Sequence, residues 1–271
     1  MQRKHRAVLL SSCVIAAVFV GMSLFPQWFT PYGRKEMFAP WLSPSWAHLL
    51  GTNALGYDVF TELVWGAGQT LLVGLSGSVI ALTVGTAIGV LAAYGGIMGR
   101  ITDGVIQIFL LLPRLITLVV LAAFVGSSRW NLIGLIAAFS WAGTARTVRA
   151  KVISLNAQPF LENCVIQGYS RFHIICRHVI PNLYDVLTSR FLLGVNGCMM
   201  MESTLSFLGF GDLYAPTWGT MIHFAYQRGA FVRRAYGYLL TPGACILLVS
   251  LCVYGISLYF TEKKQIIGEE S

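Results

Sequence analysis

The side chains best suited to chemistry gather in one polar stretch, residues 162–182, between two apolar runs. It reads ENCVIQGYSRFHIICRHVIPN and holds two thiols and two imidazoles, those of Cys164, His173, Cys176 and His178. Thiolates and imidazoles are the ligands that zinc prefers, but these four residues follow none of the usual zinc spacings. We therefore predict no metal site in this stretch.

Ser76 is a second candidate, because residues 74–77 read Gly-Leu-Ser-Gly and match the G-x-S-G of rhomboid-type intramembrane proteases. A nucleophilic serine needs a general base within hydrogen-bonding distance, and all five histidines lie outside the apolar runs. The chain also lacks the G-x-x-x-x-G-K-[ST] loop that binds ATP phosphates. We predict a protein that is not an enzyme and binds no cofactor of its own; a protease is the remote alternative.

Composition indicates a membrane protein, since 56% of the 271 residues are hydrophobic and 11% are charged. Apolar runs long enough to cross a bilayer occur at about residues 7–25, 71–96, 104–126, 131–145, 187–208 and 239–260. We predict an all-α polytopic protein with about six transmembrane helices. Its expected parts are an anchor helix with the first extracytoplasmic segment (1–70), a transmembrane core (71–260) and a cytoplasmic tail (261–271).

The basic residues predict the orientation of these spans. With a cytoplasmic N-terminus, the inner loops carry 11 Lys and Arg residues and the outer loops carry 6. Cytoplasmic loops of membrane proteins have an excess of such residues, so both termini are expected in the cytoplasm. The net charge of +8 requires no nucleic acid, because basic loops beside anionic lipid explain it.

Small residues recur at every fourth position of the second predicted span, at Gly77, Ala81, Gly85, Gly89 and Ala93. This spacing places them on one helical face, where a second helix backbone can approach closely. We expect that face to pack within the chain; a dimer contact is the alternative.

The fifth predicted span carries a polar stripe, because Asp185, Ser189, Asn196 and Ser203 fall within a sector about 40° wide. A polar stripe at membrane depth faces protein or a water-filled cavity. The stripe therefore lines a pathway or forms interhelical hydrogen bonds. Leu205 lies on the opposite side and is expected to tolerate a bulky replacement.

Arg114 follows Pro113 near the centre of the third predicted span. A cation at that depth needs water or a carboxylate around it. It either pairs with Asp185 or Glu202, or it lines the path of an anionic solute. The possible pathway residues are Arg114, Asp185, Ser189, Asn196, Glu202 and Ser203.

The polar stretch also has a fixed spacing, with Gly168 six positions after Glu162 and His178-x-x-Pro181-Asn182 beginning ten positions after the glycine. This resembles the cytoplasmic "EAA" loop of bacterial ATP-binding-cassette (ABC) importer permeases, here at about residues 151–182. In such permeases the loop docks on the ATPase subunit. Gly168 can turn the chain between two short helices, and Pro181 is expected to end the second one. The usual Ala-Ala after the Glu is replaced by Asn-Cys.

Two further blocks resemble the dipeptide, oligopeptide and nickel branch of these permeases. The first is LGT-x-x-x-G-x-D at residues 50–58, and the second is SFLGFG-x-x-x-x-P-x-WG at residues 206–219. The chain departs from the branch at Asn53, Tyr57, Glu62 and Gly68, so local contacts there must differ. Together the blocks cover about residues 48–260.

The resemblance implies the second permease subunit of an ATP-driven importer in the bacterial inner membrane, with the type I ABC importer permease fold. Its implied partners are a homologous permease, two ATP-binding subunits that hydrolyse ATP, and an extracytoplasmic solute-binding protein. The implied cargo is a peptide, nickel or a metal chelate. A membrane scaffold or channel that retains the permease pattern is the alternative.

Overall fold

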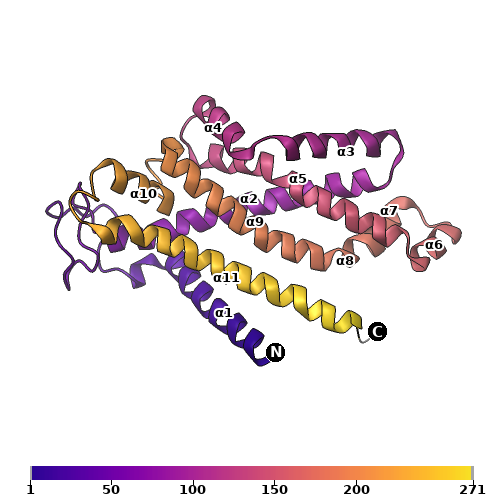
Figure 1. Cartoon of the computed structure of the whole chain (residues 1–271), viewed down its shortest axis with the longest axis horizontal. Coiled ribbons are helices and arrows are strands. Elements are labelled where there is room, and N and C mark those ends of the chain that lie inside the picture. Colours follow the sequence, from indigo (N-terminus) through magenta and orange to yellow (C-terminus); the bar gives the residue numbers. More distant parts are fainter. Residues whose placement is uncertain (1, 270–271) are drawn as a thin grey trace.

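The computed structural model describes the backbone of residues 2–269 and the side chains of residues 9–258. Over these residues the chain forms an elongated helical bundle (Figure 1), with two isolated β-bridges before α2. The predicted all-α class is therefore confirmed. The helices are α1 (Gln2–Leu24), the 3₁₀ turn η1 (Pro26–Trp28), α2 (Val59–Ala93), α3 (Gly96–Leu111), α4 (Arg114–Val125), α5 (Arg129–Asn156), α6 (Pro159–Ile166), α7 (Arg171–Ile174), the π turn η2 (Ile175–Val179), α8 (Ile180–Asn182), α9 (Tyr184–Leu205), the π turn η3 (Ser206–Phe210), α10 (Trp218–Gln227) and α11 (Tyr236–Glu269).

The small-residue face of α2 packs within the chain, as predicted, mainly against α5 and also against α9. A Cβ added to Gly85 would lie 2.6 Å from the carbonyl oxygen of Trp141 and 2.8 Å from the Cβ of Thr144. The two backbones can approach this closely only because Gly85 has no side chain. This contact fixes α5 against the centre of the bundle.

Asp58 sets the start of α2. As the N-cap residue, its carboxylate accepts hydrogen bonds from the backbone N–H of Thr61 (2.7 Å) and from the hydroxyl of Thr61 (2.8 Å). The Nδ1 of His48 lies 2.9 Å from the other carboxylate oxygen. Such a cap satisfies backbone donors that have no intrahelical partner. α2 therefore begins at Val59, well before the predicted start near residue 71.

The predicted third span, residues 104–126, is two helices rather than one. α3 ends at Leu111 and α4 begins at Arg114, and their axes differ by 87°. Pro113 has no amide hydrogen, and it holds the preceding Leu112 in an extended conformation (ψ 129°). Arg114 consequently lies at the start of α4, directly after the break.

Three helical segments of the described chain are long and apolar enough to cross a membrane: α2, residues 184–210 (α9 with η3), and α11 up to residue 258. The bent pair α3–α4 makes a fourth if it forms one span, and the described apolar part of α1, Leu9–Leu24, is shorter. α5 carries Arg146, Arg149 and Lys151 towards its end. The six predicted spans thus correspond to six helical units, three or four of which meet this criterion.

α1 and α11, the first and last helices, pack along one another on the outside of the bundle. Phe19 of α1 meets Trp218 of α10 edge-on, with ring centroids 5.5 Å apart. α11 continues to Glu269, so residues 261–269 of the predicted tail are helical. Figure 1 shows α6, α7 and α8 at one end of the molecule, here called the loop end, and α10 at the other.

Candidate functional site

The loop end is built from α6 and α7, which meet at Gly168. Gly168 has φ +80°, a left-handed conformation that other residues adopt only with strain, and the backbone N–H of Tyr169 donates to the carbonyl of Cys164 (3.2 Å). Ser170 then caps α7 by accepting the N–H of His173 (3.3 Å). The predicted turn between two short helices is therefore present.

Pro181 does not end the second short helix, contrary to the prediction. α7 continues through the π turn η2 into α8, and Pro181 lies inside α8. The wider π turn accommodates a residue that has no N–H to donate. The side-chain amide of Asn182 donates to the carbonyl of His178 (2.7 Å). The break before α9 comes at Leu183, where the helix turns.

The inner side of the loop end is a packed apolar cluster. Leu161, Ile174, Val179 and Leu183 are buried together with side chains from the ends of α2 and α5. Buried apolar contacts of this kind hold a segment rigidly on its support. The loop end therefore moves with α5 and α9 and not as a free loop.

The outer side of the loop end is exposed and partly apolar. Val165, Ile166 and Phe172 are 65%, 82% and 77% exposed, and Glu162 and Gly168 lie on the same exposed segment. Exposed apolar side chains that are close together in the chain are typical of a protein contact surface. Val165, Ile166 and Phe172 are here called the docking face.

At the other end of the molecule, Glu202 joins three segments. This fully buried carboxylate accepts hydrogen bonds from the hydroxyls of Ser206 (2.6 Å), Thr217 (2.7 Å) and Ser203 (3.3 Å). The adjacent Trp218 donates from its ring nitrogen to the carbonyl of Leu63 on α2 (2.9 Å). The SFLGFG and WG parts of the second block therefore lock α9, α10 and α2 together.

Two departures from the permease pattern contact one another. The side-chain amide of Asn53 donates to the carboxylate of Glu62 (2.8 Å), and its carbonyl oxygen accepts the N–H groups of Leu55 (2.8 Å) and Tyr57 (3.1 Å). The sequence predicted changed local contacts in this block. They include the hydrogen bond from the Asn53 amide to the Glu62 carboxylate, which links the turn before α2 to the first turn of that helix.

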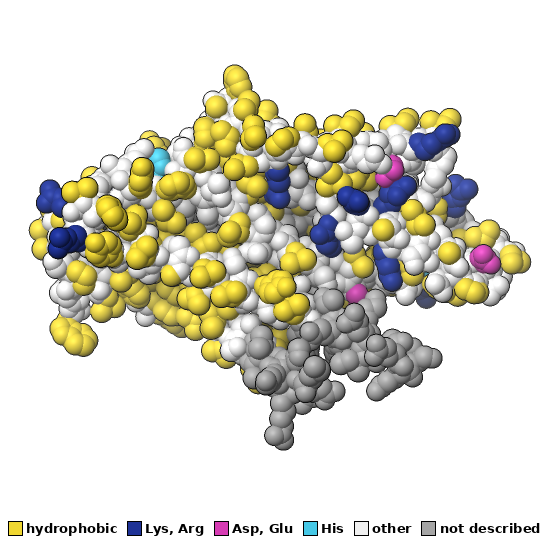
Figure 2. Space-filling model, in the orientation of Figure 1, with side chains coloured by type: hydrophobic (Ala, Val, Ile, Leu, Met, Phe, Trp, Pro, Cys, Tyr) yellow, Lys and Arg dark blue, Asp and Glu magenta, His cyan; other side chains and the backbone are white. Residues whose placement is uncertain are grey.

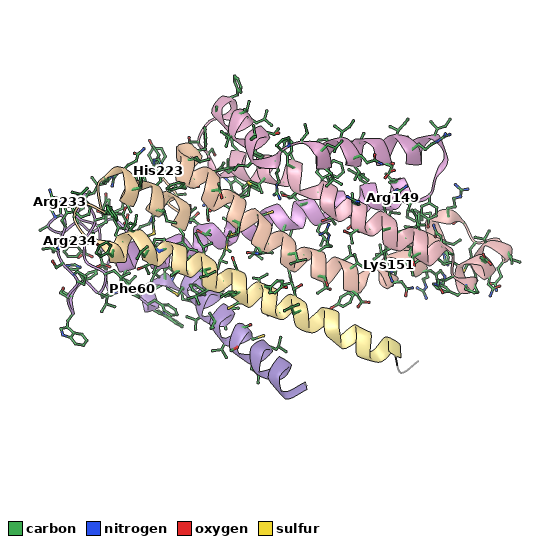
Figure 3. All side chains as sticks on the ribbon, in the orientation of Figure 1. Phe60, Arg149, Lys151, His223, Arg233 and Arg234 are labelled. Atoms are coloured by element: carbon green, nitrogen blue, oxygen red, sulfur yellow. The ribbon has the colours of Figure 1, made fainter. Side chains whose placement is uncertain are left out.

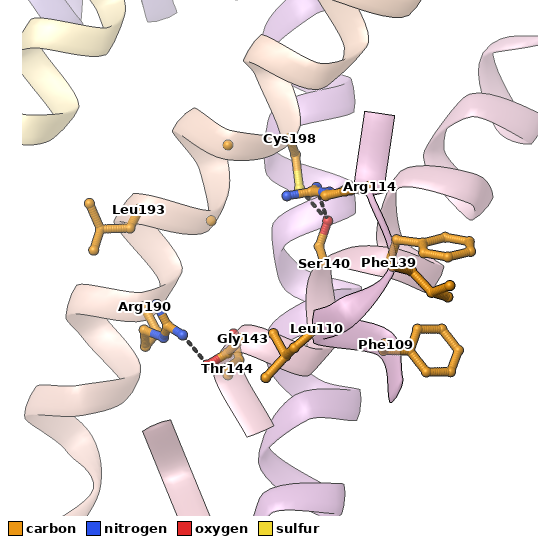
Figure 4. A pocket seen from close by; sticks show the side chains of 13 residues that line it. Phe109, Leu110, Arg114, Phe139, Ser140, Gly143, Thr144, Arg190, Leu193 and Cys198 are labelled. Carbon is orange, nitrogen blue, oxygen red and sulfur yellow. Dashed lines mark hydrogen bonds between the residues drawn. The ribbon is translucent and has the colours of Figure 1, made fainter. Parts of the chain in front are cut away.

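A cavity of about 290 Å³ lies between the α3–α4 break, α5 and α9 (Figure 4). Two arginines line it. Arg114 donates to the hydroxyl of Ser140 (2.5 Å), and Arg190, which sequence reasoning did not single out, donates to the backbone carbonyl of Gly143. Partial burial removes water from both guanidinium groups, so each needs hydrogen-bond acceptors in the cavity. Arg190 could have been found from the sequence, because it is a basic residue inside the apolar run 187–208.

Of the six residues predicted for a pathway, only Arg114 lines this cavity. The cavity meets α9 on the face of Arg190, Gly194 and Gly197, not on the predicted stripe. The stripe itself is divided: Asp185 is exposed near the loop end, Ser189 is half-buried, the Oδ1 of Asn196 is buried without a hydrogen-bond partner, and Ser203 bonds to Glu202.

One of the alternatives for Arg114 is excluded here, and the expectation for Leu205 is wrong. Glu202 does not pair with Arg114, because its oxygens accept three hydroxyls and Arg114 contacts Ser140 instead. Leu205 does not face lipid. It is fully buried in a core cluster with Val73 and Leu132, because α2 and α5 cover this side of α9.

The other candidates for chemistry are placed by their contacts. The hydroxyl of Ser76 donates to the carbonyl of Leu72 in its own helix (2.5 Å). His173 stacks on Tyr169, and its ring centroid lies 6.1 Å from that of His178. Among the described residues, no three His, Cys, Asp or Glu side chains gather as metal ligands would.

The membrane-spanning helices and the polar cavity beside a broken helix define a multi-pass helical membrane protein. The family model for the binding-protein-dependent transport system inner membrane component matches residues 85–265, which is more than half of the chain. The protein belongs to this family of ABC importer permeases.

Named relatives agree with this assignment. A Brucella suis protein with a peptide permease name is 30% identical over 253 residues, 91% of this chain and 82% of its own length. The oligopeptide transport system permease protein OppC of Haemophilus influenzae is 30% identical, covering 81% and 72%. The di/tripeptide transport system permease protein DppC of Pseudomonas aeruginosa is 30% identical, covering 92% and 84%.

Family membership establishes three general points. The chain is a multi-pass component of the bacterial inner membrane. It is a permease component and not itself an enzyme. Its family implies an ATPase and a solute-binding protein as partners.

Proposed function

We propose that this chain carries peptides inward across the membrane as one permease subunit of an ATP-driven importer. The names of the relatives, which specify dipeptides, di/tripeptides and oligopeptides, support a peptide over nickel or a metal chelate as the cargo. The specific assembly we propose has a second homologous permease, two ATP-binding subunits that hydrolyse the ATP, and an extracytoplasmic binding protein.

The docking face is the observation that supports coupling of this chain to a partner ATPase. It consists of exposed apolar side chains held on a buried cluster that also contains the ends of α2 and α5. A partner that pushes on this face therefore displaces the helices that line the cavity. Alternating access then follows as a rigid-body rotation of helices driven by ATPase closure. Glu162, Gly168, His178, Pro181 and Asn182 form the segment that transmits this motion.

We also propose that both termini and the loop end face the cytoplasm. α1 ends and α11 begins towards the α10 end, so the N-terminal end of α1 and the C-terminal end of α11 both lie away from it (Figure 1). Figure 2 shows more Lys and Arg side chains on the visible face over the half near α6 and α7, and Figure 3 places Arg149 and Lys151 there. Arg233 and Arg234 lie at the α10 end (Figure 3). The excess on the loop side agrees with the positive-inside rule.

Reconstitution with the partner subunits tests this function. Proteoliposomes containing the complex should accumulate dialanine and trialanine only when ATP and the binding protein are both supplied. Peptide entry without ATP would indicate the channel alternative. Accumulation of nickel or a nickel chelate with no peptide uptake would assign the metal cargo instead.

The docking face can be tested with one matched pair of variants. Ile166→Ser removes an 82% exposed side chain from the docking face, and Ile97→Ser removes a 72% exposed one at the start of α3. We expect Ile166→Ser to reduce co-purification of the ATPase and peptide uptake, with Ile97→Ser close to wild type. If Ile97→Ser had the same effect, the loss would reflect general surface polarity and not docking.

A further inference from the structure

Two guanidinium groups reach the same wall of the cavity. Arg114, at the start of α4, donates to Ser140, and Arg190, on α9, donates to Gly143 (Figure 4). Both acceptors lie on α5, where the hydroxyl of Ser140 also donates to the carbonyl of Ile136 (2.5 Å). An anion that enters the cavity is therefore attracted by both cations that line it.

Neither charge is compensated by the walls of the cavity. Its lining residues include no Asp or Glu, and both arginines donate to neutral acceptors. The Nε atoms of Arg114 and Arg190 are buried and have no hydrogen-bond partner. Two cations in a partly dry site repel one another and lose hydration, so an anion that accepts these donors stabilises them.

Acidic groups on the neighbouring helices are already engaged. Glu202 accepts three hydroxyls, and Asp103 pairs with Arg149 at 3.0 Å. The α4 helix adds to the positive potential of the cavity, because its first intrahelical bond runs from Thr117 to Pro113 and the N–H groups before it are at the positive end of the helix.

The rest of the lining indicates which kind of anion fits. Phe109, Leu110 and Phe139 contribute apolar walls beside the arginines. Arginine binds a carboxylate through two parallel hydrogen bonds. The cavity therefore has two arginines that can bind a carboxylate and apolar walls that can hold an uncharged side chain. The C-terminal residue of a peptide has both of these groups.

We propose that Arg114 and Arg190 form a subsite that holds the C-terminal carboxylate of the peptide during its passage. This inference rests on the proposed peptide transport and names the group by which the permease itself recognises the cargo. The solute-binding protein contributes to selection before this step.

A cysteine at Gly197 provides a local probe of the charge. Gly197 lines the cavity, and a Cβ added there has no atom within 4 Å. In the assembled transporter in nanodiscs, the modification of this cysteine would be followed by mass spectrometry with two methanethiosulfonates, one carrying a sulfonate and one a trimethylammonium. We expect the anionic reagent to react about tenfold faster, as clefts of one charge concentrate counter-ions.

Arginine variants assign the effect. Arg114→Gln and Arg190→Gln should each lower the ratio of the two rates towards one, and Arg190→Lys should retain part of it. Arg100→Gln removes an exposed arginine outside the cavity and should leave the ratio unchanged. Because both reagents reach the same cysteine, a variant that merely changes its exposure alters both rates together. An unchanged ratio in both Gln variants would overturn the subsite.

Peptide protection tests the ligand. Trialanine should slow the reaction of the cysteine with a neutral methanethiosulfonate, whereas trialanine amide should protect it at least tenfold less well, since each lost charged contact in a dry site costs about 1.4 kcal/mol or more. Equal protection by the acid and the amide would overturn the inference while leaving peptide transport intact. Slowing by anionic lipid but not by trialanine would assign the subsite to a lipid headgroup and also overturn it. Failure of the wild-type complex to accumulate any peptide would reject the proposed function and this inference together.

Discussion

Glu202 illustrates how much one buried side chain can organise at the residue scale. Its two oxygens accept hydrogen bonds from hydroxyls at the end of α9, in η3 and at the N-cap of α10. In a site with no access to water, each of these hydroxyls depends on the carboxylate for an acceptor. The residue therefore acts as a structural anchor and not as a part of the cavity.

We predict that Glu202→Ala destabilises the protein by about 3 kcal/mol, because it leaves buried hydroxyls without their charged acceptor. Glu202→Gln should lose less, since its amide oxygen still accepts. The midpoint of thermal unfolding in detergent measures both. Glu36→Ala serves as the control, because that carboxylate is exposed and bonds only to the N–H of Gly33 (3.0 Å). Similar midpoints for Glu202→Ala and Glu36→Ala would contradict the anchoring role.

At the element scale, the α2–α5 contact depends on a missing side chain. Gly85→Ala places a Cβ 2.6 Å from a backbone oxygen, so the helices must separate. We expect a loss of about 1–3 kcal/mol in the free energy of unfolding, typical of overpacking. Gly134→Ala on α5 is the matched control, because its Cβ meets no atom within 4 Å. It should be neutral or slightly stabilising as a better helix former, and a larger loss there than at Gly85 would refute the close contact.

The turn between α6 and α7 makes a second prediction at this scale. Proline fixes φ near −65° and cannot adopt the +80° of Gly168, so Gly168→Pro should reorient α6 relative to α7. Peptide uptake and solute-stimulated ATP hydrolysis should fall together, while the amount of inserted protein stays the same because the turn is exposed. Normal uptake by a well-expressed Gly168→Pro protein would rule out a role for this turn in coupling.

At the scale of the whole molecule, labelling tests the orientation. Cys176 is exposed at the loop end and should react with a membrane-impermeant maleimide only after permeabilisation. Cysteines introduced at Trp46 (99% exposed) and Tyr214 (93% exposed) should react in intact cells. Trp218, although close to Tyr214 in sequence, is fully buried and gives no information. Labelling of Cys176 in sealed cells would invert the topology.

Features that depend on the backbone of one helix or one turn were predictable from the sequence. The four-residue spacing of small side chains indicated the close face of α2, and an isolated glycine between two short polar segments indicated the turn at Gly168. Both depend on one residue or one helix, so no knowledge of neighbours was required. The three permease blocks likewise identified the family that the comparison with family models assigns.

Features that depend on several elements were not predictable. The hydropathy of residues 104–126 is that of one unbroken apolar run, and it does not indicate the 87° bend at Pro113. The polar stripe on α9 indicated which face of the helix is polar, but not which element packs against that face. The cavity lies on another face of α9. The burial of Leu205 depends on side chains of α2, α4 and α5. The network around Glu202 includes Ser206 of η3, whose π turn has no simple sequence signature.

The contact between α1 and α11 joins two helices that are far apart in the sequence. α1 packs mainly against α11, which is synthesised only after residues 25–235. Bacterial synthesis of the intervening chain takes on the order of ten seconds. During that interval α1 has lipid or a translocation factor along the surface that α11 later covers. A nascent chain truncated before Tyr236 therefore leaves uncovered the side of α1 that packs on α11 in the full bundle.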